Sequence, residues 1–273
     1  MKFRKVVWIA GVARSGTSWI GQIFNSHQNV RYRFQPLFSY EFKSRVNEDS
    51  TDAEHQQFLN DLWDTETDFL AQRDKVGSGD YPAFSKSQFS DVLAFKENRY
   101  QSVIEPMLRK VPQLHVVAIV RHPCAVIHSW SQNPKEFPVG AELRHEWRFG
   151  GCKNSGPQDY FGYYKWKEVA NLYLDLVEQF PKRVTLIHYD QMLTNRQIAT
   201  EQMLGSAGLE ITPQVEDFVS GSGNRHSRSY YSVFKNGSQV NQWKQGLDRY
   251  IAEEIAADLQ GSRLERFLHE FAA

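Results

Sequence analysis

Three short apolar runs along the chain have the composition of strands that are buried on both faces. They occupy residues 6–10 (VVWIA), 114–120 (LHVVAIV) and 184–189 (VTLIHY), and all three are rich in β-branched residues. Continuous apolar runs of this length are typical of parallel sheets, because helices cover both faces of such a sheet. The pattern therefore predicts three strands of a parallel sheet.

Amphipathic stretches separate these runs and predict helices. Apolar residues recur at helical spacing at 19, 20, 23 and 24, and again within 47–73, 163–180, 196–207 and 247–271. Strands that alternate with helices indicate an α/β fold, which we expect to form one domain over residues 1–273 with a central parallel sheet flanked by helices. Residues 221–239 are rich in Gly, Ser and Arg and predict a mobile loop.

The charges of the chain cancel, because its 273 residues include 32 Lys and Arg and 32 Asp and Glu. No overall field attracts nucleic acid or an anionic membrane, so any anion site must be local. The apolar run at 6–13 is too short to span a bilayer and lacks the cleavage pattern of a signal peptide. Cys124 and Cys152 are too few for a disulfide framework, and the nine histidines show no metal-binding spacing. We therefore expect a cytoplasmic protein without a metal site.

The loop between the first strand and its helix has the composition of an anion site. Residues 11–18 (GVARSGTS) place two glycines five positions apart at the start of a helix, where backbone N–H groups can converge on an anion. The hydroxyls of Ser15, Thr17 and Ser18 add donors. The ATP-binding form of such a loop has a lysine where Thr17 stands, whereas this loop carries its cation earlier, at Arg14.

Residues 11–19, read as Gly-x-x-Arg-Ser-Gly-Thr-Ser-Trp, resemble the 5′-phosphosulfate loop of sulfotransferases that use PAPS (3′-phosphoadenosine-5′-phosphosulfate). The resemblance implies a P-loop-like sulfotransferase architecture with PAPS as the donor and PAP as its product. It implies that Arg14 contacts the bridging and sulfuryl oxygens, stabilising the leaving group, and that Trp19 packs on the adenine. The remaining loop residues implied to bind the donor are Ser15, Gly16, Thr17 and Ser18.

A second motif supplies the counter-charge that the 3′-phosphate of PAPS requires. Arg121 stands at the carboxyl end of the second predicted strand, where open α/β sheets place ligands, and Ser129 follows eight residues later. The family carries an Arg and a Ser at this interval, both bound to the 3′-phosphate, so the resemblance implies these roles here. It also implies that Tyr189 lies near the adenine and that Lys235 closes over the 3′-phosphate.

Sulfuryl transfer to a hydroxyl or amine needs a group that accepts the acceptor's proton. Carbohydrate and tyrosine sulfotransferases have a Glu shortly after the first helix, often as Glu-Pro, whereas this chain reads Gln35-Pro36. Gln35 cannot accept a proton, and Glu41, the nearest carboxylate downstream, is our candidate. The acceptor would be a small molecule or a carbohydrate, in a pocket that we expect the aromatic residues at 147–166 and the helix at 52–73 to cover.

Two other functions stay open from the sequence. A magnesium-dependent small-molecule kinase would place its loop in the same way, although it requires Lys-Ser or Lys-Thr after the second glycine. A catalytically silent nucleotide-binding module would explain Gln35 at the position of the expected base. The sequence does not indicate an oligomeric state.

Overall fold

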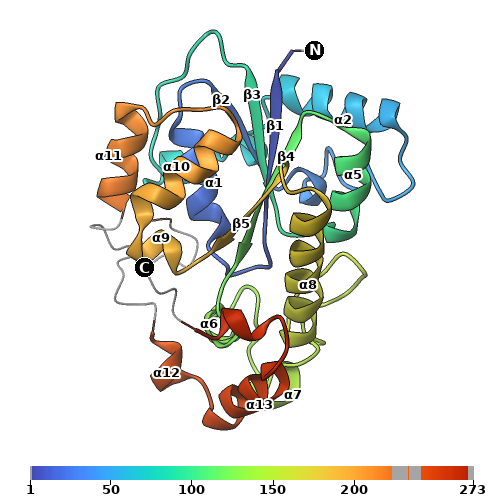
Figure 1. Cartoon of the computed structure of the whole chain (residues 1–273), viewed down its shortest axis with the longest axis vertical. Coiled ribbons are helices and arrows are strands. Elements are labelled where there is room, and N and C mark those ends of the chain that lie inside the picture. Colours follow the sequence, from blue (N-terminus) through green and yellow to red (C-terminus); the bar gives the residue numbers. More distant parts are fainter. Residues whose placement is uncertain (1, 223–232, 234–240, 270–273) are drawn as a thin grey trace.

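The computed structural model describes residues 2–222, 233 and 241–269. Its central sheet has five strands in the order β2-β3-β1-β4-β5, and every neighbouring pair is parallel. The carboxyl ends of the strands therefore meet at one edge of the sheet (Figure 1). The strands are β1 (Lys5–Ala10), β2 (Val30–Phe34), β3 (Val92–Glu97), β4 (Leu114–Val120) and β5 (Val184–His188).

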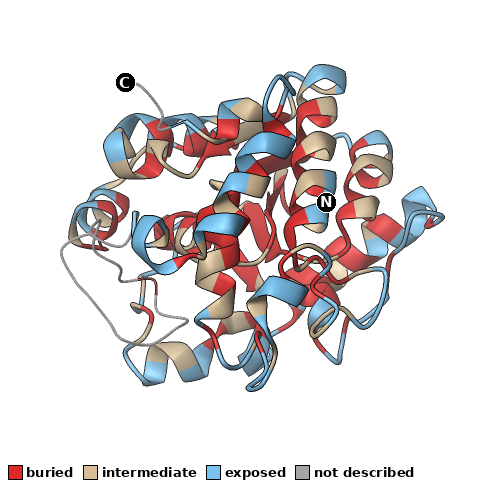
Figure 2. Ribbon diagram, turned by 90° about the horizontal axis from the view of Figure 1, so that it is seen from below, coloured by how far each residue is buried: buried red, intermediate tan, exposed pale blue. Residues whose placement is uncertain are grey.

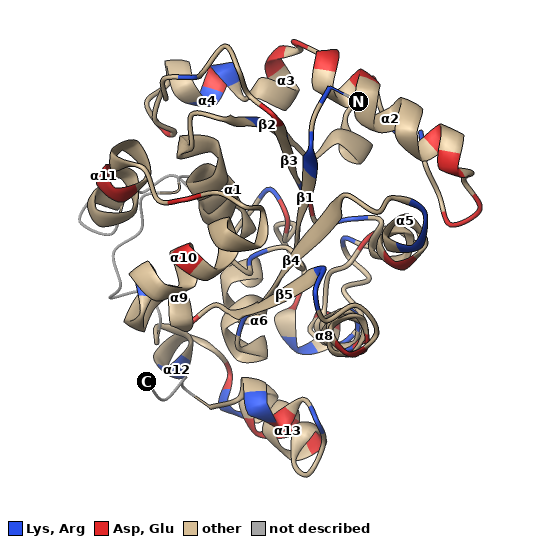
Figure 3. Ribbon diagram, turned by 45° about the horizontal axis from the view of Figure 1, so that its top comes forward, with Lys and Arg blue, Asp and Glu red and all other residues tan. Residues whose placement is uncertain are grey.

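The sequence pattern predicts β1, β4 and β5 to within one residue at each end, but it does not predict β2 or β3. These two strands read VRYRF and VLAFKE, so charged residues interrupt their apolar runs. In the structure Arg33, Lys96 and Glu97 are all buried within the sheet. Figure 3 shows few other charged residues on the central strands. Hydrogen-bond partners far away in the sequence stabilise the charges of Arg33 and Glu97, and periodicity alone cannot reveal such partners.

Helices cover both faces of the sheet, so that the strands form the buried centre of the protein (Figure 2). Val7 and Ile9 of β1 pack in one apolar cluster with the helices on one face of the sheet, whereas Trp8 belongs to the cluster on the opposite face. This alternation follows from the two-residue period of a strand. The helices on the first face are α1 (Thr17–Ser26), α9 (Gln191–Thr194), α10 (Arg196–Ser206) and α11 (Pro213–Ser222). Those on the second are α2 (Asp52–Asp64), α5 (Ile104–Lys110), α6 (Pro123–Ser131), α8 (Tyr163–Gln179) and α13 (Arg249–Leu259).

Short helices complete the described chain, and two predicted helices are shorter than expected. Within the predicted helix at 47–73, α2 begins only after a capping box and ends at Asp64. In this capping box the side chains of Thr51 and Glu54 each accept a hydrogen bond from the other residue's backbone N–H. The terminal helix ends at Leu259, shortly before Gly261, whose φ of 71° is left-handed. Of the predicted loop at 221–239, most residues lie outside the described ones. The short elements are α3 (Asp68–Ala71), α4 (Arg73–Gly77), α7 (Leu143–Glu146), α12 (Trp243–Gly246), η1 (Pro36–Phe38), η2 (Gln101–Val103) and η4 (Glu265–Phe267).

Arg33 joins the edge strand β2 to the C-terminus of α2. Its guanidinium donates to the carbonyl oxygens of Leu62 at 3.0 Å, Trp63 at 3.2 Å and Thr65 at 2.5 Å. The last carbonyls of a helix lack partners within the helix, so one buried cation satisfies several of them together. This contact holds the segment that leads from α2 into α3 beside the sheet.

Replacing Arg33 by Leu should lower the free energy of unfolding by about 2–4 kcal/mol, because the buried carbonyls at the end of α2 lose their donor. Urea denaturation followed by circular dichroism measures this loss. Arg249→Leu is the matched control, since that side chain is 91% exposed, and we expect a change below about 0.5 kcal/mol. Equal stability of both variants would contradict the structural role of Arg33.

Candidate active site

The loop after β1 reaches the cavity through two residues with positive φ, Arg14 at 73° and Gly16 at 89°. Gly16 lies against the ring of Tyr189, and a Cβ at Gly16 would come within 2.3 Å of that ring, so a larger residue does not fit. Arg121 donates from Nη1 to the carbonyl oxygen of Arg14 at 2.9 Å. This hydrogen bond holds the loop in a conformation that is uncommon for a residue with a side chain.

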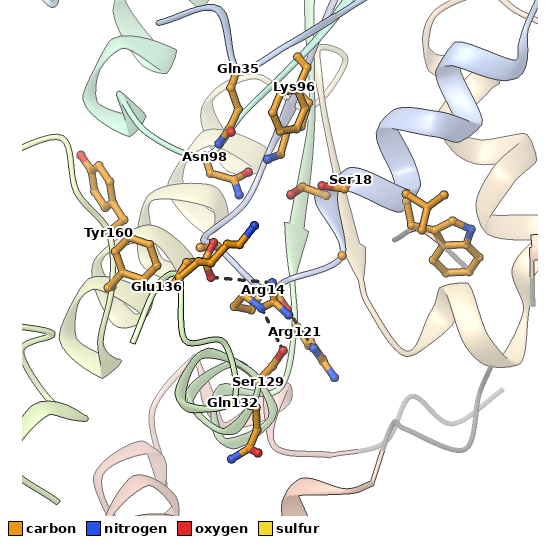
Figure 4. A pocket seen from close by; sticks show the side chains of 18 of the residues that line it. Arg14, Ser18, Gln35, Lys96, Asn98, Arg121, Ser129, Gln132, Glu136 and Tyr160 are labelled. Atoms are coloured by element: carbon orange, nitrogen blue, oxygen red, sulfur yellow. Dashed lines mark hydrogen bonds and ion pairs between the residues drawn. The ribbon is translucent and has the colours of Figure 1, made fainter. Parts of the chain in front are cut away.

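Two arginines and a serine from distant parts of the chain meet at this loop. The Nε of Arg14 donates to the hydroxyl of Ser129 on α6 at 3.1 Å (Figure 4). The guanidinium of Arg121 lies 4.7 Å from the centre of the Tyr189 ring. Burial lowers the pKa of Arg121, and the neighbouring charge of Arg14 adds to this effect. Guanidinium groups nevertheless stay charged in proteins, so the site favours an anionic ligand that relieves their repulsion.

Aromatic side chains lie on the side of the loop that faces β5. The rings of Trp19 and Tyr189 pack edge to face with their centres 6.5 Å apart. The indole Nε1 of Trp19 donates to the hydroxyl of Ser222 at 3.0 Å, and the guanidinium of Arg196 lies 5.3 Å from the Trp19 ring. These contacts fix the orientation of Trp19 beside the loop, where a planar base could pack against it.

The carboxyl end of β3 brings a buried lysine to the same cavity. Lys96 is 3% exposed, and its ammonium lies 4.7 Å from the centre of the Phe34 ring. With the amide of Asn98 turned to suit its neighbours, its nitrogen donates to the Gly11 carbonyl at 3.2 Å and to the Thr17 hydroxyl at 3.0 Å. Its oxygen then accepts from the Lys96 ammonium at 3.3 Å. Asn98 therefore links the lysine to both ends of the anion loop.

The protonation of Lys96 is sensitive to its surroundings. Burial lowers the pKa of Lys96 to about 8, while the charges of Glu97 and Glu136 oppose this shift. Burial also raises the pKa of the adjacent Glu97 carboxyl. Glu97 accepts from the backbone N–H groups of Leu37, Asn98 and Arg99 at 3.0–3.1 Å, so its carboxylate stabilises backbone turns rather than a ligand.

The cavity between these elements holds about 1180 Å³, enough for a nucleotide together with a second substrate. The loop, Arg121 and Ser129 form one side of it. A second side carries aromatic rings from η1, α3 and the segment before α8. Amide and charged side chains lie between the two sides. The residues of the second side and of the part between the two sides include Gln35, Phe38, Phe69, Gln72, Lys75, Lys96, Asn98, Arg99, Lys135, Glu136, Lys153, Tyr160 and Phe161.

The structure brings most of the predicted donor residues together at the cavity wall. Ser15 is the exception within the loop, because it is fully buried behind the wall and its hydroxyl has no hydrogen-bond partner among the described residues. Lys235 lies outside the described residues. Those that line the cavity are Arg14, Gly16, Thr17, Ser18, Trp19, Arg121, Ser129 and Tyr189.

Two expectations about the acceptor side need correction. Glu41 is exposed and accepts a hydrogen bond from the hydroxyl of Thr65 at 3.2 Å, and the cavity wall does not include it. Of the aromatic residues at 147–166, all of them described, only Tyr160 and Phe161 line the wall, and Trp147, Tyr163 and Trp166 are buried in the core. The helix at 52–73 contributes only through its last part, α3 and its surroundings.

Among the polar residues of the cavity that sequence reasoning missed are Lys96, Asn98 and Glu136. Lys96 and Asn98 come at the end of β3, which the apolar pattern did not predict as a strand. A signal was available, because polar residues that directly follow a strand lie at the ligand edge of a parallel sheet. Glu136 follows α6 in a turn and carries no such signal.

The described part of the chain contains no group of three or more His, Cys, Asp or Glu residues that could hold a metal ion. None of its helices is long and apolar enough to cross a membrane. Cys124 and Cys152 are both free thiols. The cytoplasmic location stays a prediction.

Comparisons with known proteins show the family of this chain. The model of the Sulfotransferase family matches residues 7–213. Carbohydrate sulfotransferase 3 of Rattus norvegicus is 24% identical over an alignment 337 positions long, which covers 98% of this chain and 68% of that protein.

Solved structures show a similar fold at low sequence identity. Mouse sulfotransferase SULT7A1 complexed with PAP has a TM-score of 0.58 at 12% identity, covering 98% of this chain and 89% of that one. Retinol dehydratase in complex with androsterone and PAP has a TM-score of 0.53 at 12% identity, covering 96% of this chain and 82% of that one. The sulfotransferase domain of the curacin biosynthetic pathway has a TM-score of 0.51 at 14% identity, covering 95% of this chain and 98% of that one.

These structural similarities confirm the predicted α/β fold with its central parallel sheet. The family match extends from β1, before the anion loop, to the start of α11 and thus includes both predicted anion motifs. The chain therefore belongs to the sulfotransferase family, as its loop at residues 11–19 predicts.

Proposed function

We propose that this chain transfers the sulfuryl group of PAPS to a hydroxyl group of a carbohydrate. The observation that carries the proposal is the convergence of Arg14, Arg121 and Ser129 at the carboxyl edge of the sheet, beside the N-terminus of α1. PAPS has two anionic parts, the 5′-phosphosulfate and the 3′-phosphate, and the cavity offers an arginine for each. The match to the Sulfotransferase family and the two similar structures that contain PAP support the same donor.

The donor would lie along the loop with its 5′-phosphosulfate at the start of α1. There the loop N–H groups, the hydroxyls of Thr17 and Ser18, and the guanidinium of Arg14 can contact its oxygens. Arg121 and Ser129 would hold the 3′-phosphate, and the adenine would lie against Trp19. ATP lacks a 3′-phosphate, and this loop lacks the lysine of ATP-binding loops, so the kinase alternative is not favoured.

The chemical step would be an in-line displacement at sulfur. The acceptor oxygen attacks the sulfur atom while the bond between sulfur and the 5′-phosphate oxygen breaks. Negative charge then grows on that phosphate oxygen, where Arg14 and the loop can stabilise it, while Lys96 lies beside the loop as a cation for the sulfuryl oxygens. The protein contributes position and charge, and no redox chemistry is required.

A carbohydrate acceptor fits the second side of the cavity. Phe38, Tyr160 and Phe161 offer flat apolar faces, and Gln35 lies nearby with polar groups that can hydrogen-bond hydroxyls. The similarity to carbohydrate sulfotransferase 3 supports this acceptor class.

Replacing Arg14 by Ala tests this proposal directly. The variant should lose about 100- to 1000-fold in kcat, because one preorganised donor to the leaving oxygen is removed. Transfer from radiolabelled PAPS to unsulfated polysaccharides of neutral, amino-sugar and uronic-acid types measures the rate. Arg249→Ala is the surface control and should retain full activity. A folded Arg14→Ala protein with near-normal turnover would overturn the proposal.

The pH dependence of kcat/KM should report the charge of Lys96. Since burial lowers its pKa to about 8, the free enzyme loses this cation as the pH rises through that value, and kcat/KM should fall above about pH 8. Lys96→Met should lower kcat/KM at neutral pH and remove this basic limb. An unchanged basic limb in Lys96→Met would show that another group titrates.

A further inference from the structure

The proposed reaction requires a proton acceptor beside the acceptor hydroxyl, and the described residues of the cavity wall include three carboxylates, Asp68, Asp74 and Glu136. Asp68 has a 67% exposed side chain and is ion-paired with Arg73 at 2.5 Å. Asp74 is also exposed to solvent on α4. Such solvated carboxylates are poorly placed to act within an enclosed site. The side chain of Glu136 is only 17% exposed.

The carboxylate of Glu136 is directed toward the anion loop. Its Oε2 lies 3.8 Å from Nη1 of Arg14, which is close enough for charge attraction but too long for a hydrogen bond (Figure 4). This Oε2 is buried and has no hydrogen-bond partner among the described residues. Buried carboxylate oxygens are rarely left without a donor, so the position fits a group that receives its partner from a bound substrate.

The backbone fixes Glu136 in a tight turn after α6. The N–H of Glu136 donates to the carbonyl oxygen of Asn133 at 2.9 Å, and the indole of Trp130 donates to the carbonyl oxygen of Glu136 at 3.0 Å. Asn133 is fully buried, and Trp130 is 1% exposed. Ser129 precedes this turn on α6, so one rigid segment carries both a proposed donor ligand and the carboxylate.

We propose that Glu136 is the general base of the sulfuryl transfer, an inference that rests on the proposed function. Glu136 accepts the proton of the acceptor hydroxyl while the oxygen forms its bond to sulfur. The bond between sulfur and the 5′-phosphate oxygen breaks in the same step, leaving PAP and the sulfate ester. Glu136 releases the proton to solvent after product release, which restores the carboxylate.

Charged and titratable groups from five parts of the described chain face the same region. The anion loop contributes Arg14, and β3 contributes Lys96, whose charge interacts with that of Glu136. On α6, His128 has its pKa lowered by burial and by Arg121, and its ring packs against Gly246.

The segment before α8 contributes Lys153 and Tyr160, and burial raises the pKa of Tyr160 to about 12. Following β3, Arg99 is ion-paired with Asp159 at 2.9 Å.

The test is Glu136→Gln, which keeps the shape of the side chain and removes its basicity. We expect kcat to fall about 100- to 10,000-fold and the acidic limb of the pH profile of kcat/KM to disappear. The basic limb assigned to Lys96 should persist. Calorimetric titration with PAP should give an affinity within about threefold of wild type, because the proposed base contacts the acceptor hydroxyl and is not a ligand of the donor. Glu142→Gln is the matched control, because its side chain is 72% exposed, and it should behave as wild type.

Three results would overturn the inference. In the first, Glu136→Gln keeps its rate and its acidic limb. In the second, PAP affinity and kcat fall together while the acidic limb stays, because Glu136 would then only position Arg14. In the third, the acidic limb is lost in His128→Gln and kept in Glu136→Gln. A wild-type protein that binds no PAP would instead overturn the proposed function, and this inference with it, before any kinetic comparison is made.

Discussion

The hydrogen bond from Arg121 to the carbonyl oxygen of Arg14 is the contact on which the rest of the site depends. It joins the ends of two neighbouring strands, β4 and β1, at the ligand edge of the sheet. By holding Arg14 in a left-handed conformation, it directs that guanidinium toward Ser129 and Glu136. Two partly buried cations held this close repel each other, so the arrangement is most favourable when an anion lies between them.

The end of β3 shows how one strand can combine a structural and a chemical role. Successive side chains point to opposite faces, so Lys96 faces the cavity while Glu97 bonds backbone N–H groups on the other side. Each of these buried charges has partners, which limits the cost of taking it out of water. The altered pKa values of both groups follow from this burial.

Apolar periodicity was sufficient to predict the strands with uncharged interiors and the alternation of these strands with helices. The sequence also predicted the loop and the Arg121–Ser129 pair, because motif spacing determines them locally. It could not predict β2 and β3, whose buried charges depend on partners elsewhere, such as the carbonyls of α2 for Arg33. Glu136 was missed for a similar reason: its turn approaches Arg14 only once α6 has packed against the sheet.

The most direct test of the account is a calorimetric comparison of PAP with AMP, which lacks the 3′-phosphate, on wild type and on Arg121→Ala. The account predicts that wild type binds PAP more tightly than AMP. It also predicts that Arg121→Ala weakens PAP about 10- to 150-fold more than it weakens AMP, because only PAP loses the charged hydrogen bond to its 3′-phosphate. Equal affinity of wild type for both nucleotides, or unchanged PAP binding by the variant, would contradict the proposed donor site.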